Sequence, residues 1–266
     1  MNLESGADDG AGLLTLRNNS AQDAIILDAK GDETGAFLKV GNREGIITAV
    51  VHGSAGDGSA RLSLKNDSGE TTILMDGDDG EDASKVLLFD NVGTETVQID
   101  GRLPLGGGQL SVNAHNGTKT IELIGREDFN GAIASGMGSQ LKLRKSSGTR
   151  TVELNSRAAE GDGGAMQLFD ENGVLTSELT ADMGEGKSAL RLFHGETGTE
   201  TLRAVGSEFG TQGAQILIKN SSGNTTIELD GEGSGGSTDG GLVRLKKNNG
   251  DATITLDSDA NGEGKI

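Results

Sequence analysis

Two acidic, glycine-containing stretches are the places in this sequence where side chains could bind a metal ion. In one of them, Asp257, Asp259 and Asn261 occupy alternate positions and a glycine follows. Oxygen ligands at alternate positions with a glycine at the bend are typical of a calcium-binding loop. The other stretch contains Asp76 and Asp78. We therefore name these five residues as candidate calcium ligands. The alternative is that both stretches are solvated acidic turns.

No combination of side chains points to catalysis. The three histidines, His52, His115 and His194, stand in different sequence surroundings, so we expect no shared metal site. The chain has no Cys and no Gly-x-Ser-x-Gly motif, which leaves no recognisable nucleophile. We therefore predict that the protein is not an enzyme and, apart from the calcium hypothesis, needs no cofactor.

A repeat of about 24 residues runs along the sequence and is its dominant feature. Each repeat contains two apolar pairs, such as Leu62/Leu64 followed by Ile73/Met75. The extra residues of the longer repeats follow the second pair, and the widest insertion runs from Gly125 to Ser139. We interpret the chain as a single array over 1–266. Its ten repeats span 12–35, 36–59, 60–83, 84–107, 108–138, 139–163, 164–187, 188–212, 213–240 and 241–266.

The spacing within each repeat predicts two short strands and no helix, because apolar and polar residues alternate at period two. Glycine recurs between the strands, as at Gly69 and Gly93, which indicates a positive φ at a turn. Aromatic residues are only 2% of the chain, so we expect the apolar pairs to form a narrow aliphatic core. Threonine recurs just before the second pair, at Thr48, Thr72, Thr96, Thr120, Thr151, Thr176, Thr201, Thr226 and Thr253.

Three arrangements of these strands fit the pattern. In a β-solenoid, the two strands of a repeat face each other across the core, and each pairs with its counterpart in the next repeat. In a hairpin array, the two strands pair with each other. We favour an all-β solenoid of about ten strand-arc-strand units, because each threonine would then stack on the next. A triple-stranded β-fibre, in which three chains share one core, and the hairpin array stay open as alternatives.

Charged residues recur at the outward positions of both strands. The first strand carries basic residues at Lys39, Lys142, Arg191 and Arg244. The second carries acidic residues at Glu122, Glu153, Glu178 and Glu228. In a solenoid these sets would give one basic and one acidic face. Because the glutamates recur with the repeat, we interpret them as a solvent-facing column of charge and not as paired carboxylates for glycoside cleavage.

The repeat can be written Leu-x-Leu-x-Asn-x-x-Gly-x-x-Thr-Ile-x-Leu-Asp-Gly, and the third repeat matches it except for Met75 in place of the last Leu. In this form it resembles the fibrous β-repeats of bacterial surface proteins and phage tail-fibre shafts over essentially the whole chain. With two strands per repeat it is also similar to curli-type amyloid repeats, but it lacks their Gln and Asn ladders. The resemblance implies a fibre protein at an extracellular, cell-surface or virion location.

The charge of the chain limits its partners. With 41 acidic and 23 basic residues, its net charge is −18, which disfavours nucleic acids and anionic membranes. No apolar run approaches the length of a membrane span, so we expect no membrane insertion. The stretch from Met1 to Gly6 has neither the basic nor the apolar region of a signal peptide.

These observations favour a structural subunit of an extracellular filament or virion fibre. We expect copies to join head to tail through exposed β-edges, since no polar cap covers either end of the array. The partner is then the chain itself, as a homopolymer or homotrimer. The alternative is an adhesin-like module that binds a glycan or cell-surface receptor through the loops from Gly125 to Ser139 and from Gly231 to Gly241. Few aromatic residues are available there to stack on sugars.

Overall fold

The computed structural model describes residues 2–5, 12–31, 35–55, 59–77, 84–101, 107–125, 138–156, 163–181, 188–206, 213–231 and 241–258. All regular elements in these ranges are β-strands, which confirms the predicted all-β class. No helix among the described residues has the length and apolar character needed to cross a lipid bilayer.

Two compact units divide the chain, an N-terminal unit (Met1–Phe129) and a C-terminal unit (Asn130–Ile266). The strands of the N-terminal unit are β1 (Asn2–Ser5), β2 (Gly12–Arg17), β3 (Asp23–Gly31), β4 (Gly35–Gly41), β5 (Ile47–Ala55), β6 (Ser59–Lys65), β7 (Thr71–Asp76), β8 (Lys85–Phe89), β9 (Glu95–Asp100), β10 (Gln109–Asn113) and β11 (Lys119–Ile124). The strands of the C-terminal unit are β12 (Gln140–Arg144), β13 (Arg150–Asn155), β14 (Ala165–Phe169), β15 (Leu175–Thr180), β16 (Ala189–Phe193), β17 (Glu200–Val205), β18 (Gln215–Lys219), β19 (Thr225–Asp230), β20 (Leu242–Lys246) and β21 (Ala252–Asp257).

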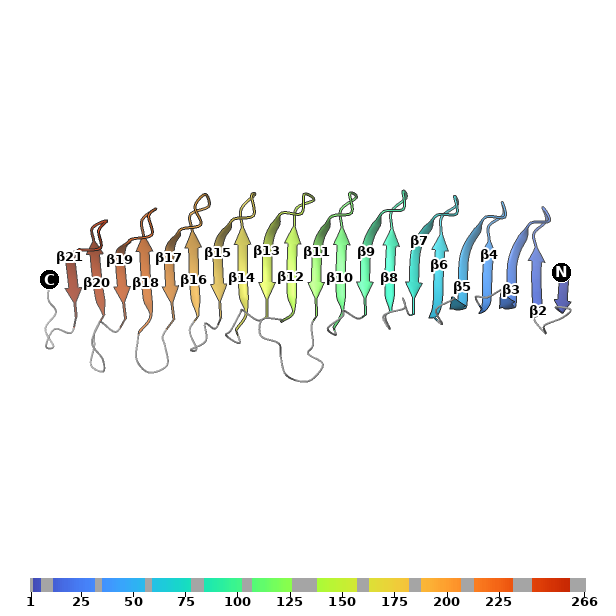
Figure 1. Cartoon of the computed structure of the whole chain (residues 1–266), viewed down its shortest axis with the longest axis horizontal. Helices are drawn as coiled ribbons and strands as arrows, with labels where there is room; N and C mark the ends of the chain where they lie inside the picture. Colours follow the sequence, from blue (N-terminus) through green and yellow to red (C-terminus); the bar gives the residue numbers. More distant parts are fainter. Residues whose placement is uncertain are drawn as a thin grey trace. The chain divides into compact units, whose positions relative to one another are not determined.

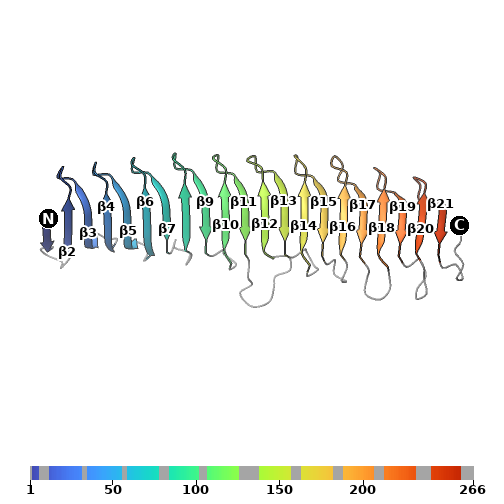
Figure 2. The ribbon, with the colours of Figure 1, turned by 180° about the vertical axis from the view of Figure 1, so that it is seen from behind.

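Within each unit, consecutive strands pair side by side and form an antiparallel meander (Figure 1). The two strands of each repeat form a hairpin, and the hairpin turns of a unit lie along one edge of its sheet. The same order is seen from behind (Figure 2). Apart from β1, which lies before the first predicted repeat, the strands form one hairpin for each repeat, with β4 and β6 beginning one residue before the predicted bounds.

The pairing is that of the hairpin array and not that of the solenoid we favoured. Leu64 of β6 pairs with Ile73 of β7, and Ile73 pairs in turn with Leu88 of β8. In a solenoid, Leu64 and Leu88 would be direct neighbours. A tight turn with a glycine at positive φ reverses the chain at once, so the second strand lies beside the first. Each repeat therefore advances the sheet by two strand spacings, about 9.6 Å, instead of one.

The hairpin turns confirm the predicted role of glycine. In the β6–β7 turn, Asn66 Oδ1 accepts hydrogen bonds from the backbone N–H groups of Ser68 at 3.0 Å and Glu70 at 2.9 Å. The Gly69 N–H donates to the Asn66 carbonyl at 2.9 Å, with φ of +84° at Gly69. Nine of the ten hairpin turns contain such a glycine, and the first has Ala21 at φ +62° instead.

The recurring threonine occupies a β-bulge. The register shifts between the pairs Leu64/Ile73 and Lys65/Thr71, which leaves Thr72 as the extra residue. Its Oγ1 donates to the Leu64 carbonyl at 3.3 Å. The same bond recurs at Thr48, Thr96, Thr120, Thr151, Thr176, Thr201, Thr226 and Thr253. Threonine therefore recurs because it bonds a carbonyl within its own hairpin, and the stacking that favoured a solenoid is not needed to explain it.

The apolar pairs of all repeats lie on one face of each sheet, here called the apolar face. Their side chains form two rows across the strands. The turn row, nearer the hairpin turns, contains Leu16, Ile25, Val40, Ala49, Leu64, Ile73, Leu88, Val97, Val112 and Ile121 in the N-terminal unit and Leu143, Val152, Leu168, Ser177, Leu192, Leu202, Ile218, Ile227, Leu245 and Ile254 in the C-terminal unit. The middle row contains Leu14, Leu27, Leu38, Val51, Leu62, Met75, Val86, Ile99, Leu110 and Leu123, and then Leu141, Leu154, Met166, Leu179, Leu190, Ala204, Ile216, Leu229, Val243 and Leu256.

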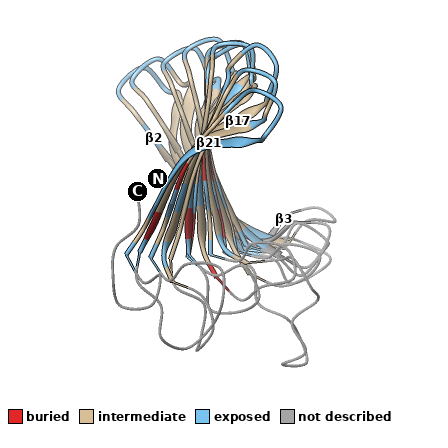
Figure 3. Cartoon of the chain, turned by 90° about the vertical axis from the view of Figure 1, so that its left-hand side faces the viewer, coloured by how far each residue is buried: buried red, intermediate tan, exposed pale blue. Residues whose placement is uncertain are grey.

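The prediction that these rows form a buried core is wrong for the single chain. None of their described side chains is buried, and Leu179 is 52% exposed. Among the described residues, no second layer covers this face. The buried residues alternate along the strands with those of the two rows and therefore lie on the opposite face, where Val50 is 6% exposed and Ser111 is fully buried. Figure 3 shows the buried positions as red segments of the strands.

Candidate functional site

The apolar face is the most prominent candidate for an interaction site. In the N-terminal unit its exposed large side chains are Leu27, Val51, Met75, Ile99, Ile121 and Leu123. In the C-terminal unit they are Leu154, Met166, Leu179, Leu190, Leu192, Ile216, Ile218, Leu229, Ile254 and Leu256. Neither row contains a charged residue. Contiguous apolar patches of this kind mark interaction surfaces in proteins.

A third row on the apolar face consists entirely of small residues. Because side chains alternate along a strand, the positions two residues beyond the middle row share its face. They are Gly12, Ala29, Ala36, Gly53, Ala60, Gly77, Ser84, Gly101, Gly108 and Gly125 in the N-terminal unit, and Ser139, Ser156, Gly164, Ala181, Ser188, Gly206, Ala214, Gly231, Gly241 and Ser258 in the C-terminal unit. Backbone hydrogen bonds extend the ladder through this small row, as from the Gly77 N–H to the Ala60 carbonyl at 2.8 Å.

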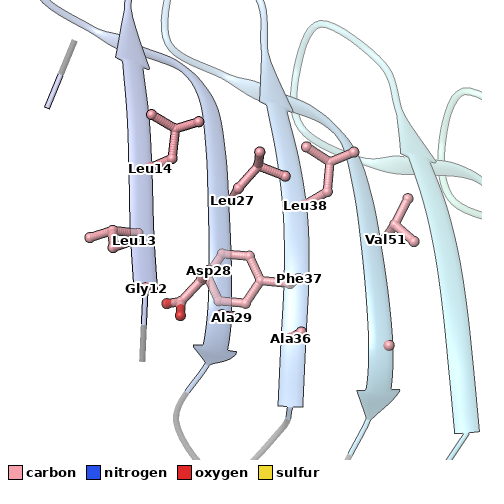
Figure 4. A pocket seen from close by; sticks show the side chains of 11 residues that line it. Gly12, Leu13, Leu14, Leu27, Asp28, Ala29, Ala36, Phe37, Leu38 and Val51 are labelled. Carbon is pink, nitrogen blue, oxygen red and sulfur yellow. The ribbon is translucent and has the colours of Figure 1, made fainter. Parts of the chain in front are cut away.

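The step from the middle row down to the small row forms an open groove. In the first two hairpins, Leu14, Leu27 and Leu38 of the middle row stand beside Gly12, Ala29 and Ala36 of the small row (Figure 4). The groove there has a volume of about 820 Å³. A second groove of about 340 Å³ follows the same step through Leu62, Met75 and Val86. Large side chains therefore project from the turn and middle rows of the apolar face, whereas the small row forms a depression beside them.

The opposite face of the C-terminal unit carries cross-strand acid–base pairs. Glu178 lies opposite Arg191, with Oε2 and Nη1 3.3 Å apart. Glu228 lies opposite Arg244 at 3.7 Å and also contacts Lys246 Nζ at 2.6 Å. The expectation of separate basic and acidic faces is thus wrong. Hairpin pairing places the first and second strands side by side, so their outward charges share one face.

The recurring glutamates of the two units are not a solvent-facing column. Glu122, Glu153 and Glu228 are only 8%, 6% and 9% exposed. Each has an ion-pair partner, and Arg150 Nη1 lies 2.5 Å from Glu153 Oε2. Buried carboxylates need such partners, because an unpaired buried charge is costly. A structural role therefore accounts for these glutamates better than paired catalytic carboxylates.

Within the described residues, the first and the last strand of the chain each have a single pairing partner. β21 pairs only with β20, and five of its six residues are exposed, from Ala252 to Leu256. β1 likewise pairs only with β2. An edge strand exposes backbone N–H and carbonyl groups that can pair with another chain.

The five candidate calcium ligands fall largely outside the described residues. Asp78, Asp259 and Asn261 lie there, so only two of the candidates can be placed. Asp76 is buried at the end of β7, and its Oδ2 accepts a hydrogen bond from Arg61 Nε at 2.8 Å. Asp257 ends β21. Among the described residues, no group of three or more His, Asp or Glu side chains is arranged to hold a metal ion. Calcium binding stays a prediction.

The three histidines lie apart in separate hairpins. His52 lies on β5 with its ring centroid 6.0 Å from that of Phe37. His194 contacts Thr197 in its own turn. His115 Nδ1 lies 2.7 Å from Asp90 Oδ2 and connects two neighbouring turns. Desolvation raises the pKa of Asp90, but the N–H groups of Thr94 and Val92 and the side chain of His115 outweigh it and lower that pKa below its ordinary value.

The small row escaped the sequence analysis, although the sequence contains its signal. The period-two alternation continues two residues past the middle row in every repeat, but those positions hold Gly, Ala and Ser and resemble ordinary loop residues. The burial of the glutamates had no comparable signal, since a charged residue at an alternating position is usually exposed.

The fold defines a class: an antiparallel sheet built from repeated bulged hairpins, with an open apolar face. No protein-family model matches this chain, and no match emerges among curated proteins. The geometry of the sheet therefore has to indicate the function.

Proposed function

We propose that this protein is a structural subunit of an extracellular filament or virion fibre, in which copies join end to end through the free edges of β21 and β1. The observation that carries the proposal is the exposed edge of β21. β21 contains no proline, and among the described residues no element covers its outer edge, two features that usually protect an edge strand.

The interior of the sheet supports the same proposal. Each repeat contributes a bulged hairpin, and most repeats share the same turn and apolar pairs, so the end of the array presents the strand pattern that its interior already pairs. A further hairpin from another copy would continue the ladder by the same main-chain hydrogen bonds. The resemblance of the repeat to fibrous surface and tail-fibre proteins agrees with this role and with an extracellular or virion location.

The proposal gives the residues no catalytic part. Backbone ladders and aliphatic rows supply stiffness, and the net charge of −18 opposes uncontrolled bundling of fibres. The adhesin alternative depends on loops whose interiors, 126–137 and 232–240, lie outside the described residues. No described feature favours it over the fibre.

Electron microscopy and sedimentation of the purified chain test the proposal. We expect filaments whose length grows with protein concentration and whose fibre diffraction shows a meridional spacing of about 4.8 Å, from strands lying across the axis. In the variant Thr255→Pro, one backbone N–H of β21 is lost. Whether that group faces β20 or the free edge, the terminal ladder is broken and filaments should disappear.

The matched control is Thr255→Val, which keeps the N–H and a β-branched side chain. It should polymerise like the parent chain. A parent protein that forms no filaments at any concentration, or a Thr255→Pro variant that polymerises normally, would contradict end-to-end joining through β21.

A further inference from the structure

We infer that the apolar face is covered by the apolar faces of other copies of this chain, packed around an axis parallel to the direction in which the strands stack. In this arrangement the turn row of one copy lies against the small row of its neighbour, and the middle rows meet each other. The contact is separate from the end-to-end contact of the proposed function and does not depend on it.

The size of the exposed surface calls for a partner. In the C-terminal unit alone, ten large apolar side chains are 37–52% exposed. Together with the half-buried members of the two rows, they leave on the order of 700 Å² of apolar surface. That is close to the roughly 800 Å² that each partner buries in a stable protein interface. The N-terminal unit adds a further surface of the same kind.

The pattern of the face identifies the partner. The turn and middle rows contain no charged residue, so no charged ligand is selected. A partner must instead present apolar side chains at the strand spacing of about 4.8 Å over many strands. The apolar face of another copy presents such side chains at the same spacing, because it is built from the same strands. Packing apolar faces together also turns the charged opposite faces outward, which keeps two chains of net charge −18 as far apart as the contact allows.

The difference in side-chain size between the rows fixes the relative orientation of two copies. If copies met with equivalent rows in register, two high rows would collide at one side and two small rows would leave a gap at the other. A rotation that relates two copies about an axis along the stacking direction places the turn row of one copy against the small row of the other. Large side chains then lie against small ones, and the contact is filled evenly. The grooves beside Leu27, Leu38 and Met75 are then filled by turn-row side chains of the neighbour. Both a two-chain and a three-chain group satisfy this relation.

Replacing a small residue with a large one distinguishes this specific packing from non-specific hydrophobic association. Ala214 is an exposed member of the small row, and Ser221 is exposed in the turn of the same hairpin. Ala214→Leu should weaken association at least tenfold, because the longer side chain blocks the neighbour's turn row. Ser221→Leu adds more apolar surface off the face and should leave the mass unchanged. Light scattering of the soluble, non-filamentous fraction measures both. Stronger association of Ala214→Leu would overturn the inference.

Cysteine mapping gives a second test in folded protein, since the chain has no natural Cys. Ser84, Val86 and Leu88 place one residue in the small, middle and turn rows of the same strand. Val86→Cys should cross-link to itself. Ser84→Cys and Leu88→Cys should not cross-link alone but should do so when mixed. Self-linking of Ser84→Cys, or no linking in any combination, would overturn the proposed orientation.

The mass distinguishes the remaining outcomes. Two or three chains per particle support the inference. A monodisperse monomer in the parent protein overturns it, including a monomer that binds lipid vesicles. If Thr255→Pro abolishes filaments but keeps the multimer, both contacts exist. A multimer in a protein that never forms filaments refutes the end-to-end function and leaves the face contact intact.

Discussion

The two compact units share an apolar face but differ on the opposite one. The central row of that face in the N-terminal unit is Thr15, Ile26, Lys39, Val50, Ser63, Leu74, Leu87, Gln98, Ser111 and Glu122. In the C-terminal unit it is Lys142, Glu153, Gln167, Glu178, Arg191, Arg203, Leu217, Glu228, Arg244 and Thr255. Two of these residues are charged in the first unit and seven in the second.

This difference shows which part of the repeat the fold constrains. The apolar face, the bulge and the turn are the same in both units, whereas the opposite face accepts either aliphatic and hydroxyl residues or ion pairs. Both fillings produce buried side chains, Val50 in one unit and Glu153 in the other. Side chains that lie opposite each other on neighbouring strands must be compatible, but they can be either uncharged residues or oppositely charged pairs.

The largest effect is expected when a charge enters the largely uncharged row of the N-terminal unit. Leu74→Lys places an ammonium group between Ser63 and Leu87, neither of which can neutralise it. Urea unfolding should show a loss of about 3 kcal/mol. The matched change in the other unit is Gln167→Lys, between Glu153 and Glu178. It should cost at least about 1 kcal/mol less, because an acidic residue lies opposite it on each side. Equal losses would mean that the two faces do not differ electrostatically.

Removal of a charge from the charged row should give the next largest effect. Glu228→Gln removes the partner of Lys246 and Arg244, and we expect a loss of about 2 kcal/mol. Adding Lys246→Met should recover part of it, since the unpaired ammonium is then absent. A double-mutant cycle from thermal unfolding measures this coupling. A coupling energy near zero would show that the pair at 2.6 Å contributes little.

The first hairpin offers a stabilising change that involves neither face. Ala21 has φ +62°, a conformation that costs an L residue about 1 kcal/mol relative to glycine. Ala21→Gly should raise the free energy of unfolding by about that amount. The reciprocal variant Gly93→Ala, at φ +82° with open space for a Cβ, should lower it similarly. The two variants should change the free energy of unfolding in opposite directions. A loss of stability in both would reject the explanation by backbone conformation.

The smallest effect concerns pH and the turns of the N-terminal unit. The lowered pKa of Asp90 means that its carboxylate stabilises the fold above the unfolded-state pKa of about 3.9. This contribution is lost as the pH falls through the lower folded-state pKa. Asp90→Asn should therefore be less stable than the parent at pH 7, and the difference should shrink as the pH falls through the folded-state pKa of Asp90. A difference that persists in acid would assign the effect to something other than titration.

The sequence predicted the local elements well, because they depend on contacts within about ten residues. Period-two alternation located the strands, and Gly69 and its equivalents located the turns. The choice between solenoid and hairpin failed at Thr72, whose recurrence has two physical explanations that read alike in sequence. The burial of Glu153 depends on a neighbouring strand from another repeat, and the calcium residues Asp78 and Asp259 lie outside the described ranges.

The two-strand advance of each repeat makes the hairpin the unit in which this molecule changes length. Removing residues 60–83 deletes β6 and β7 and brings β8 to the place of β6 beside β5. Ala49 then meets Leu88 instead of Leu64, and every row continues without a phase error. Removing one strand would reverse the direction of all that follow. Each added or removed repeat should therefore change the length of the sheet by about 9.6 Å. Variants with more or fewer repeats should differ only in length and keep the same cross-section.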